Sequence, residues 1–181
     1  MAIRSICEKD QGILRKKSKK VEQINDKIIQ LLDDLKDTLM EADGIGLAAP
    51  QVGILKRIAI IDSGEEVIEL INPVITEREG EQVYLEGCLS VPGMYGNVGR
   101  PEKVTVIALN RDGEEMEYQA EGLLAVAFCH EIDHLDGVMF TDKVKGKLYS
   151  IEELNEMEKK NENDENTKKN EISENTEKDV E

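Results

Sequence analysis

Aromatic residues are scarce in this 181-residue sequence, which has no tryptophan, two phenylalanines and four tyrosines. A chain of this length corresponds to one domain of ordinary size, so its core must be built mainly from aliphatic side chains. Cysteines are also few, and the odd number formed by Cys7, Cys88 and Cys129 at wide spacings excludes a disulfide framework. This usage is typical of a protein in a reducing, cytoplasmic compartment.

Long hydrophobic runs are absent. The longest, Leu123 to Cys129, is far shorter than a membrane span, and the N-terminal residues include no apolar stretch of the length found in signal peptides. We therefore expect a cytoplasmic protein with no membrane contact. The formal net charge is −16, and acidic residues are densest after residue 150. Residues 161–181 are polar and charged, which predicts a disordered acidic tail that follows a domain of residues 1–160.

Helical periodicity indicates three helices. Apolar residues recur at three- and four-residue intervals over 25–42, with Asn25 or Asp26 available as N-cap and Gly44 just past the end. From Gly122 to Leu135 the apolar residues occur nearly all round, as in a helix buried inside a domain. The spacing of Ser150 and Glu153 is that of a capping box, which predicts a last helix over 151–160.

Short β-like runs fill the region between the first two helices. They cover Arg57–Ile61, Val67–Ile71 ending at Asn72-Pro73, Gln82–Leu85, Lys103–Leu109 and Glu115–Ala120, with a hairpin turn at Asn110–Gly113. No helical pattern separates these runs, so we expect an α+β fold with mixed or antiparallel sheets around the buried helix. Two glycines and a proline in residues 44–51 predict an ordered loop that other groups can approach closely.

The two histidines of the chain lie four residues apart, in His130-Glu131-Ile132-Asp133-His134. On a helix, this spacing places both imidazoles on one face, within reach of a single metal ion. Glu131 directly follows the first histidine and is placed to act as a general base on an attacking water. The segment therefore predicts a metal-dependent hydrolase.

Two imidazoles alone make an incomplete site, and the third ligand decides the type of hydrolase. A third histidine six residues after the second is excluded, because Phe140 occupies that position. A zinc metalloprotease would use a glutamate of the expected last helix, Glu152, Glu153 or Glu156. Cys88 is the other candidate, since a thiolate with two imidazoles leaves a fourth position open for water. A non-catalytic metal-binding or ribosome-associated factor is a third hypothesis.

Three segments resemble, in order and spacing, the signature motifs of bacterial peptide deformylases. They are Gly44-Ile45-Gly46-Leu47-Ala48-Ala49-Pro50-Gln51, Glu86-Gly87-Cys88-Leu89-Ser90 and His130-Glu131-Ile132-Asp133-His134-Leu135-Asp136-Gly137. The resemblance covers roughly residues 1–160, and every motif position with a catalytic role in that family is present. It implies removal of the formyl group from N-formylmethionyl nascent peptides, with release of formate.

The resemblance also implies roles for single residues. The implied metal ligands are Cys88, His130 and His134. The implied ion is ferrous iron, replaceable by zinc, nickel or cobalt, although the donor set itself suits zinc equally well. Glu131 would take a proton from the attacking water and pass it to the leaving amine. The Gln51 side-chain amide and the Leu89 backbone N–H would stabilise the negative oxygen that develops.

Substrate contacts follow from the same resemblance. The peptide backbone is expected to lie extended beside residues 44–47 as an added strand, which explains a glycine at position 46. The methionine side chain needs an apolar pocket, and the matching positions are Ile45, Leu123, Val126 and Ala127. We expect a monomer. Ribosome contact is expected of the family, but the acidic C-terminal end of this chain would be repelled by RNA phosphates.

Overall fold

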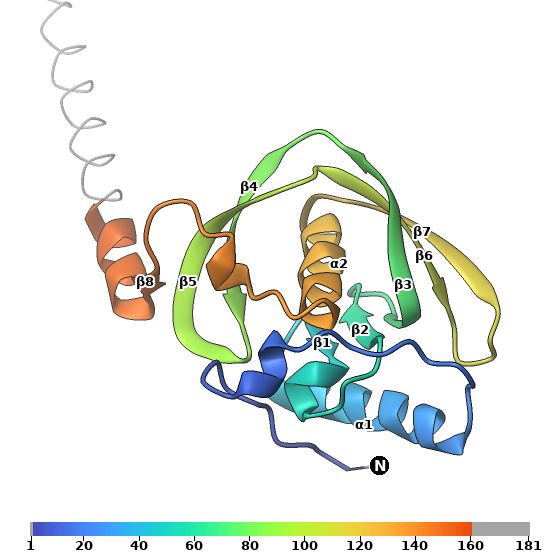
Figure 1. The fold of residues 1–181 in the computed structure, drawn as a ribbon. Helices are drawn as coiled ribbons and strands as arrows, with labels where there is room; N and C mark the ends of the chain where they lie inside the picture. The colour runs from blue at the N-terminus through green and yellow to red at the C-terminus, as the bar shows by residue number, and fades with distance from the viewer. Residues whose placement is uncertain (1, 161–181) are drawn as a thin grey trace, which may run out of the picture.

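A computed structural model describes residues 2–160 of the chain as helices packed with two sheets (Figure 1). The five-stranded sheet has the order β1-β2-β3-β6-β7, with bounds Gly46–Ala48, Ile58–Asp62, Val67–Glu79, Lys103–Leu109 and Glu115–Glu121. The three-stranded sheet has the order β4-β5-β8, with bounds Gln82–Cys88, Val91–Arg100 and Tyr149–Ser150. All pairs between these strands are antiparallel, which confirms the α+β class.

The helices begin and end close to the predicted residues. Helix α1 covers Asp26–Ala42, and the Asn25 side chain accepts hydrogen bonds from the first turn, as an N-cap does. The left-handed residue that ends it is Asp43, one position before the glycine expected to stop the helix. Helix α2 covers Gly122–Leu135, the predicted bounds. Residues 151–160 are helical and begin with reciprocal hydrogen bonds between Ser150 and Glu153, the predicted capping box.

Strand β2 is buried on both faces because a helix covers each side of the five-stranded sheet. Ile58 and Ile60 belong to the apolar cluster formed with α1, whereas Ala59 and Ile61 belong to the cluster formed with α2. This alternation is the period of two that a strand imposes on its side chains. Each fully buried leucine or isoleucine contributes about 1.5–3 kcal/mol relative to exposure. In Figure 1, α2 stands in the middle of the molecule and α1 runs along its base.

Two expectations for the strands were wrong in part. Residues 44–51 are not a simple loop, because they contain β1 and a 3-10 helix, η2, at Ala49–Val52. The strand expected to end at Asn72-Pro73 continues to Glu79 as β3. A register shift between Ile71 and Val74 takes the proline out of the regular ladder. Asn72 adopts a left-handed φ of 54° there, and its side chain bonds both backbone groups of Val21.

Strands β5 and β8 were not predicted from the sequence. Strand β5 contains Pro92 and three glycines, so its composition is that of a turn region. It pairs with β4, which extends from the predicted Gln82–Leu85 run to Cys88. Short 3-10 helices at Gly12–Arg15 (η1) and Phe140–Asp142 (η3) contribute Leu14 and Phe140 to a third apolar cluster beside β5.

Two further expectations concern the whole chain. Among residues 2–160, no helix combines the length and the apolar character that crossing a membrane requires. The predicted disordered tail, residues 161–181, lies outside the described residues.

Candidate active site

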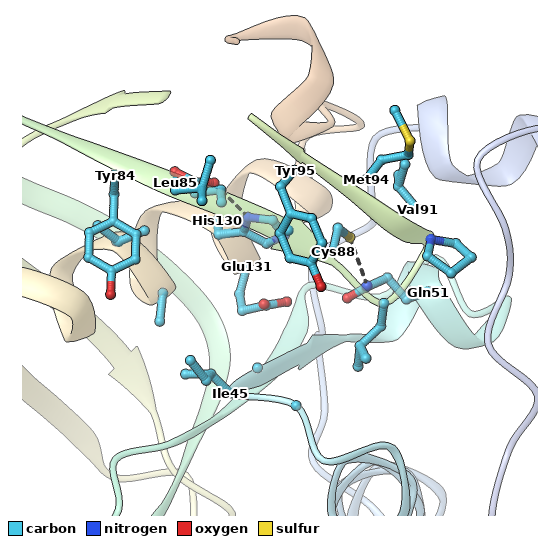
Figure 2. A pocket seen from close by; sticks show the side chains of 18 of the residues that line it. Ile45, Gln51, Tyr84, Leu85, Cys88, Val91, Met94, Tyr95, His130 and Glu131 are labelled. Carbon is cyan, nitrogen blue, oxygen red and sulfur yellow. Dashed lines mark hydrogen bonds and ion pairs between the residues drawn. The ribbon is translucent and has the colours of Figure 1, made fainter. Parts of the chain in front are cut away.

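Three distant parts of the sequence meet around one cavity of about 430 Å³ (Figure 2). Helix α2 contributes His130 and Glu131 near its middle, η2 contributes Gln51, and the end of β4 contributes Cys88. Leu89 follows Cys88 in the turn between β4 and β5 and also lines the cavity. His134 lies one helical turn beyond His130 and is 1% exposed.

Cys88, His130 and His134 form a cluster of potential metal ligands. One ligand atom from each residue lies within 4.8 Å of the others. The distance from His134 Nε2 is 3.3 Å to Cys88 Sγ and 3.2 Å to His130 Nε2. Tetrahedral sulfur and nitrogen ligands of a zinc-like ion lie about 3.3–3.8 Å apart, so the donor set fits one divalent ion. Within residues 2–160 no other such cluster is found, and Glu152, Glu153 and Glu156 take no part in this one.

A buried ion-pair network holds His130 from behind. Its Nδ1 lies 2.8 Å from Glu86 Oε2, so the carboxylate accepts the Nδ1 proton and holds the ring with its Nε2 atom facing Cys88 and His134. Arg100 donates to both oxygens of Glu86 at 2.6 and 2.9 Å, and to Asp133 at 2.6 Å. Burial alone would raise the pKa of Glu86, but the hydrogen bonds from Arg100 and His130 lower it. Glu86 therefore stays ionised at neutral pH.

The two imidazoles differ in basicity although both are buried. Burial alone would lower the pKa of His130, but hydrogen bonds with Cys88 and Glu86 raise it to about 10. Burial also lowers the pKa of His134, and the neighbouring charges of His130 and Arg100 lower it further. The Nδ1 atom of His130 is bonded to Glu86, whereas the Nδ1 atom of His134 has no hydrogen-bond partner within residues 2–160. His134 is therefore neutral, the form that binds metals, whereas His130 would release its Nε2 proton when an ion binds.

Glu131 presents a buried carboxylate beside the cavity. The side chain is 4% exposed, and its Oε2 atom has no hydrogen-bond partner among the described residues. Burial raises the pKa of Glu131 to about 7, although the charge of His130 opposes this effect. A carboxylate with this pKa can accept a proton and return it near neutral pH. Gly46 lies against this group, since a Cβ atom there would be 2.5 Å from Glu131 Oε1. The glycine at position 46 thus leaves room for the Glu131 side chain.

The side-chain amide of Gln51 points its nitrogen toward the cavity. Its Oε1 atom accepts a hydrogen bond from the Ala48 N–H at 2.8 Å, which fixes the orientation of the amide. The Nε2 atom then lies 3.2 Å from Ser90 Oγ and 3.6 Å from Cys88 Sγ. Gln51 therefore offers N–H donors beside the proposed ligands.

Apolar side chains form the rest of the wall. The positions expected to hold the methionine side chain all line the cavity: Ile45, Leu123, Val126 and Ala127. Ile45 and Leu123 are 47% and 42% exposed, whereas Val126 and Ala127 are buried. Tyr84, Leu85, Met94 and Tyr95 also line it and were not singled out from the sequence. Tyr84 and Leu85 belong to β4, and Met94 and Tyr95 belong to β5. The sequence of neither strand has a pattern that indicates a binding site.

The comparisons with known proteins agree with this geometry. Residues 3–148 match the protein family described as polypeptide deformylase. A peptide deformylase of Acetivibrio thermocellus is 56% identical over 90% of this chain and 93% of that protein. One from Caldicellulosiruptor bescii is 60% identical over 80% of this chain and 87% of that protein. The crystal structure of a peptide deformylase from Legionella pneumophila, 46% identical, has a TM-score of 0.77 and covers 80% of this chain and 87% of its own. The chain therefore belongs to the polypeptide deformylase family.

Proposed function

We propose that this chain hydrolyses the formyl amide of N-formylmethionyl peptides. One water is consumed, the bond between the formyl carbon and the amine nitrogen breaks, and formate and a free amine are released. Family membership supports the reaction. The observation that carries it is a three-donor ligand cluster next to a buried carboxylate with a free oxygen, in one cavity with an apolar wall.

Cys88, His130 and His134 are the proposed ligands of one divalent ion, ferrous iron, with zinc, nickel or cobalt as substitutes. Their mutual distances fit one ion, and within residues 2–160 no fourth side-chain ligand belongs to the cluster, so water would have room to bind beside them. When bound, such an ion lowers the pKa of water and so supplies a nucleophile near neutral pH. Glu86 supports the assignment, because it fixes the His130 ring with its Nε2 atom toward the other two ligands.

Glu131 is the proposed general base and acid. Its unpaired Oε2 accepts a proton from the attacking water and then delivers it to the amine nitrogen as the amide bond breaks. The pKa of about 7 supports both steps, since neither protonation state is strongly disfavoured at neutral pH. Such a group is typically worth about 10² to 10⁴ in rate.

Gln51 and Leu89 are the proposed donors to the oxygen that becomes negative during attack. The orientation of the Gln51 amide supports this role, because its oxygen is already bonded and its nitrogen faces the cavity. Leu89 directly follows Cys88 in the turn between β4 and β5 and lines the same cavity, which supports its backbone N–H as the second donor. Loss of one such donor typically costs about 10² to 10³ in rate.

The substrate peptide is proposed to bind as an added strand. Strand β1 is an edge of the five-stranded sheet and β4 is an edge of the three-stranded sheet, and residues of both line the cavity. Free backbone groups on such edges bind extended peptides. Ile45, Leu123, Val126 and Ala127 then provide the apolar surface for the methionine side chain.

Two sets of substitutions in the full chain distinguish this function from a metalloprotease. In Cys88→Ser we expect loss of the bound ion and of formate release from a formyl-Met peptide. The triple variant Glu152→Gln, Glu153→Gln, Glu156→Gln should retain both. Metal content is measured on protein purified without oxygen, with about one iron expected per chain. The reverse pattern would support the protease.

Glu131→Ala tests the mechanism apart from metal binding. We expect a fall in kcat of about 10² to 10⁴ with the metal content unchanged. Nearly full activity in this variant would contradict the proposed role of Glu131.

The remaining proposals concern the whole protein. We propose that residues 1–160 are the catalytic domain of a cytoplasmic monomer, and that the acidic residues 161–181 are dispensable for catalysis. Deleting them should leave kcat/KM and Tm unchanged. Because the substrates are nascent chains, we expect the enzyme to act at the ribosome. RNA phosphates would repel the acidic C-terminal end, so another surface of the protein would make any contact with the ribosome. Cosedimentation with ribosomes should therefore survive deletion of residues 151–181.

A further inference from the structure

Positive charge gathers on one surface of this acidic chain. The run at residues 15–20 contains five lysines and arginines, and the structure places it beside Lys56 and Arg57, just before β2. The Lys19 N–H bonds the Leu55 carbonyl at 3.1 Å, and the Lys19 carbonyl accepts the Arg57 N–H at 2.9 Å. Seven cations thus form one basic surface: Arg15, Lys16, Lys17, Lys19, Lys20, Lys56 and Arg57.

Much of this charge is not neutralised by neighbouring acids. Asp136 pairs with Lys17 at 3.4 Å and with Arg57 at 2.8 Å, and Asp142 pairs with Arg15. Within residues 2–160 the remaining four cations form no ion pair: Lys16, Lys19, Lys20 and Lys56. Two carboxylates therefore offset seven cations, in a chain whose net charge is −16.

The fold holds the backbone of the basic surface in place. Ser18, in the middle of the run, is 5% exposed, and its N–H bonds the Leu135 carbonyl at 2.8 Å. Lys19 and Lys56 form a parallel β-bridge, which joins the run to the segment before β2. A surface whose backbone is already ordered binds a partner at a lower entropic cost than a flexible basic run does.

The composition of the basic surface shows which kind of partner fits it. None of the exposed large apolar side chains within residues 2–160 belongs to it. Protein interfaces have an apolar core, and membrane-bound surfaces insert apolar side chains, whereas nucleic-acid interfaces are polar and strongly positive. The surface also has no aromatic residue on which unpaired bases could stack. We propose that the basic surface binds the phosphate backbone of helical RNA.

The negative charge of the rest of the chain does not prevent this contact. At 0.1 M salt, exposed charges more than about 10 Å apart are largely screened from each other. Phosphates that touch the basic surface therefore respond mainly to its own cations.

The basic surface and the mouth of the cavity lie at opposite ends of α2. Leu123, in the first turn, lines the cavity and is 42% exposed. The basic run crosses the other end, where Ser18 bonds Leu135 (Figure 1). The helix between them is about 18 Å long, so bound RNA leaves the mouth open to peptides. The ribosome is one source of such RNA, and that identification rests on the proposed function; a free RNA helix offers the same phosphates.

The test measures binding of the metal-loaded full chain to a labelled RNA duplex of about 20 base pairs, by fluorescence anisotropy, and to ribosomes, by cosedimentation. Five net charges predict that log K for the duplex falls against log salt concentration with a slope of about −4 to −5. In the quadruple variant Lys16→Gln, Lys19→Gln, Lys20→Gln, Lys56→Gln we expect a slope of about −1 and binding weakened by about 10-fold or more at low salt. Its kcat/KM for a formyl-Met peptide should stay unchanged, because none of the four lysines lines the cavity.

The matched control removes four exposed lysines elsewhere, in Lys36→Gln, Lys103→Gln, Lys145→Gln, Lys159→Gln, and should bind RNA nearly as the unmodified chain does. Equal slopes and affinities in the unmodified chain and the first quadruple variant, or an equal loss in the control, would overturn the inference. Binding to ribosomes without binding to the duplex would also overturn it, because the contact would then be with ribosomal protein. Binding to the duplex alone would support the RNA surface and place its partner outside the ribosome. Absence of formate release from the unmodified chain would overturn the proposed function and leave the RNA measurements unaffected.

Discussion

The orientation of a single amide decides whether Gln51 can stabilise negative charge. Gln51 is 1% exposed, and its oxygen is held by the Ala48 N–H, so the nitrogen must face Ser90 and the cavity. Ser90 is completely buried, and its hydroxyl accepts one of the two Nε2 protons. The other Nε2 proton faces Cys88 Sγ, 3.6 Å away, which is the side on which the substrate oxygen is proposed to bind. Ser90 is thus a positioning residue that acts through Gln51.

Ser90→Ala should lower kcat by about 3- to 10-fold and leave KM nearly unchanged. Without the Ser90 hydroxyl, the Gln51 side-chain amide can rotate away from the reacting carbonyl, but the surfaces that bind the rest of the peptide stay the same. The loss stays below the 10² to 10³ typical of removing a donor altogether. Steady-state kinetics on a formyl-Met peptide measure the two constants. In a Gln51→Ala background the same change should have no further effect on kcat. Additive effects of the two substitutions would contradict the coupling.

Glu86→Gln should weaken metal binding by about 10- to 100-fold, because the carboxylate that accepts the His130 proton loses its charge. Competition with a chelator at constant pH measures the dissociation constant. Glu69→Gln is the matched control, since Glu69 also pairs with an arginine, Arg111, but does not line the cavity. Unchanged affinity in Glu86→Gln, or an equal loss in Glu69→Gln, would show that the network does not tune the site.

The residues proposed for the site from the sequence lie together in the structure, whereas the residues that support them were not predicted. The spacing of His130 and His134 on a helix already indicates one face, whereas the choice of Cys88 over a glutamate needed the resemblance. Glu86 precedes Cys88 by two residues in a strand, so it lies on the same face, and this was the one available signal. Arg100 gave none, because its contacts with Glu86 and Asp133 span 14 and 33 residues of sequence.

At the scale of elements, the helices were predictable because their periodicity extends over several turns. Strand β1 was not, since three residues are too few to show an alternation and one of them is a glycine. Strand β5 bends around the site with glycines at positions where side chains of other segments come close. A Cβ at Gly96 would lie 2.6 Å from the Val144 side chain. These requirements for glycine come from tertiary packing, so they cannot be predicted from the β-propensity of the local sequence.

Gly46 links β1 to the chemistry of α2. In Gly46→Ala the new methyl group would meet Oε1, Cδ and Cγ of Glu131 at 2.5–2.8 Å, so the carboxylate must move. We expect kcat to fall by about 10- to 100-fold, which is less than the full rate contribution of a general base, because the carboxylate is displaced but still present. Tm and metal content should be nearly unchanged. Gly12→Ala is the control, because nothing lies within 4 Å of a Cβ there. Full activity in Gly46→Ala would show that Glu131 tolerates displacement.

At the scale of the whole molecule, an N-terminal segment connects distant parts of the fold, although its polar sequence shows no regular pattern. Residues 2–21 run across η2, the end of α2 and β3 (Figure 1). The Cys7 N–H bonds the Gln51 carbonyl, and the Ser18 N–H bonds the Leu135 carbonyl. These backbone contacts hold both the Gln51 segment and the histidine helix in place. Because they join groups far apart in sequence, only the folded structure reveals them.

Asp34 of α1 anchors the beginning of this segment and makes stability depend on pH. Burial alone would raise the pKa of Asp34, but hydrogen bonds from Gln30, the Ala2 N–H and Arg4 lower it. A carboxyl whose pKa is lower in the folded than in the unfolded chain stabilises the fold above its unfolded pKa, about 3.9. That contribution disappears as the pH falls through the folded pKa.

Asp34→Asn should therefore reduce the free energy of unfolding by about 1–3 kcal/mol at pH 7, where it leaves Arg4 without its anionic partner. The difference between the two proteins should shrink steadily below about pH 4, because the unmodified carboxyl is then protonated as well. Urea unfolding at pH 7, 5 and 3.5 measures both effects. Asp112→Asn, an exposed site in the β6–β7 turn, should change stability little at any pH. A difference that stays constant down to pH 3 would mean that Asp34 acts through its shape rather than its charge.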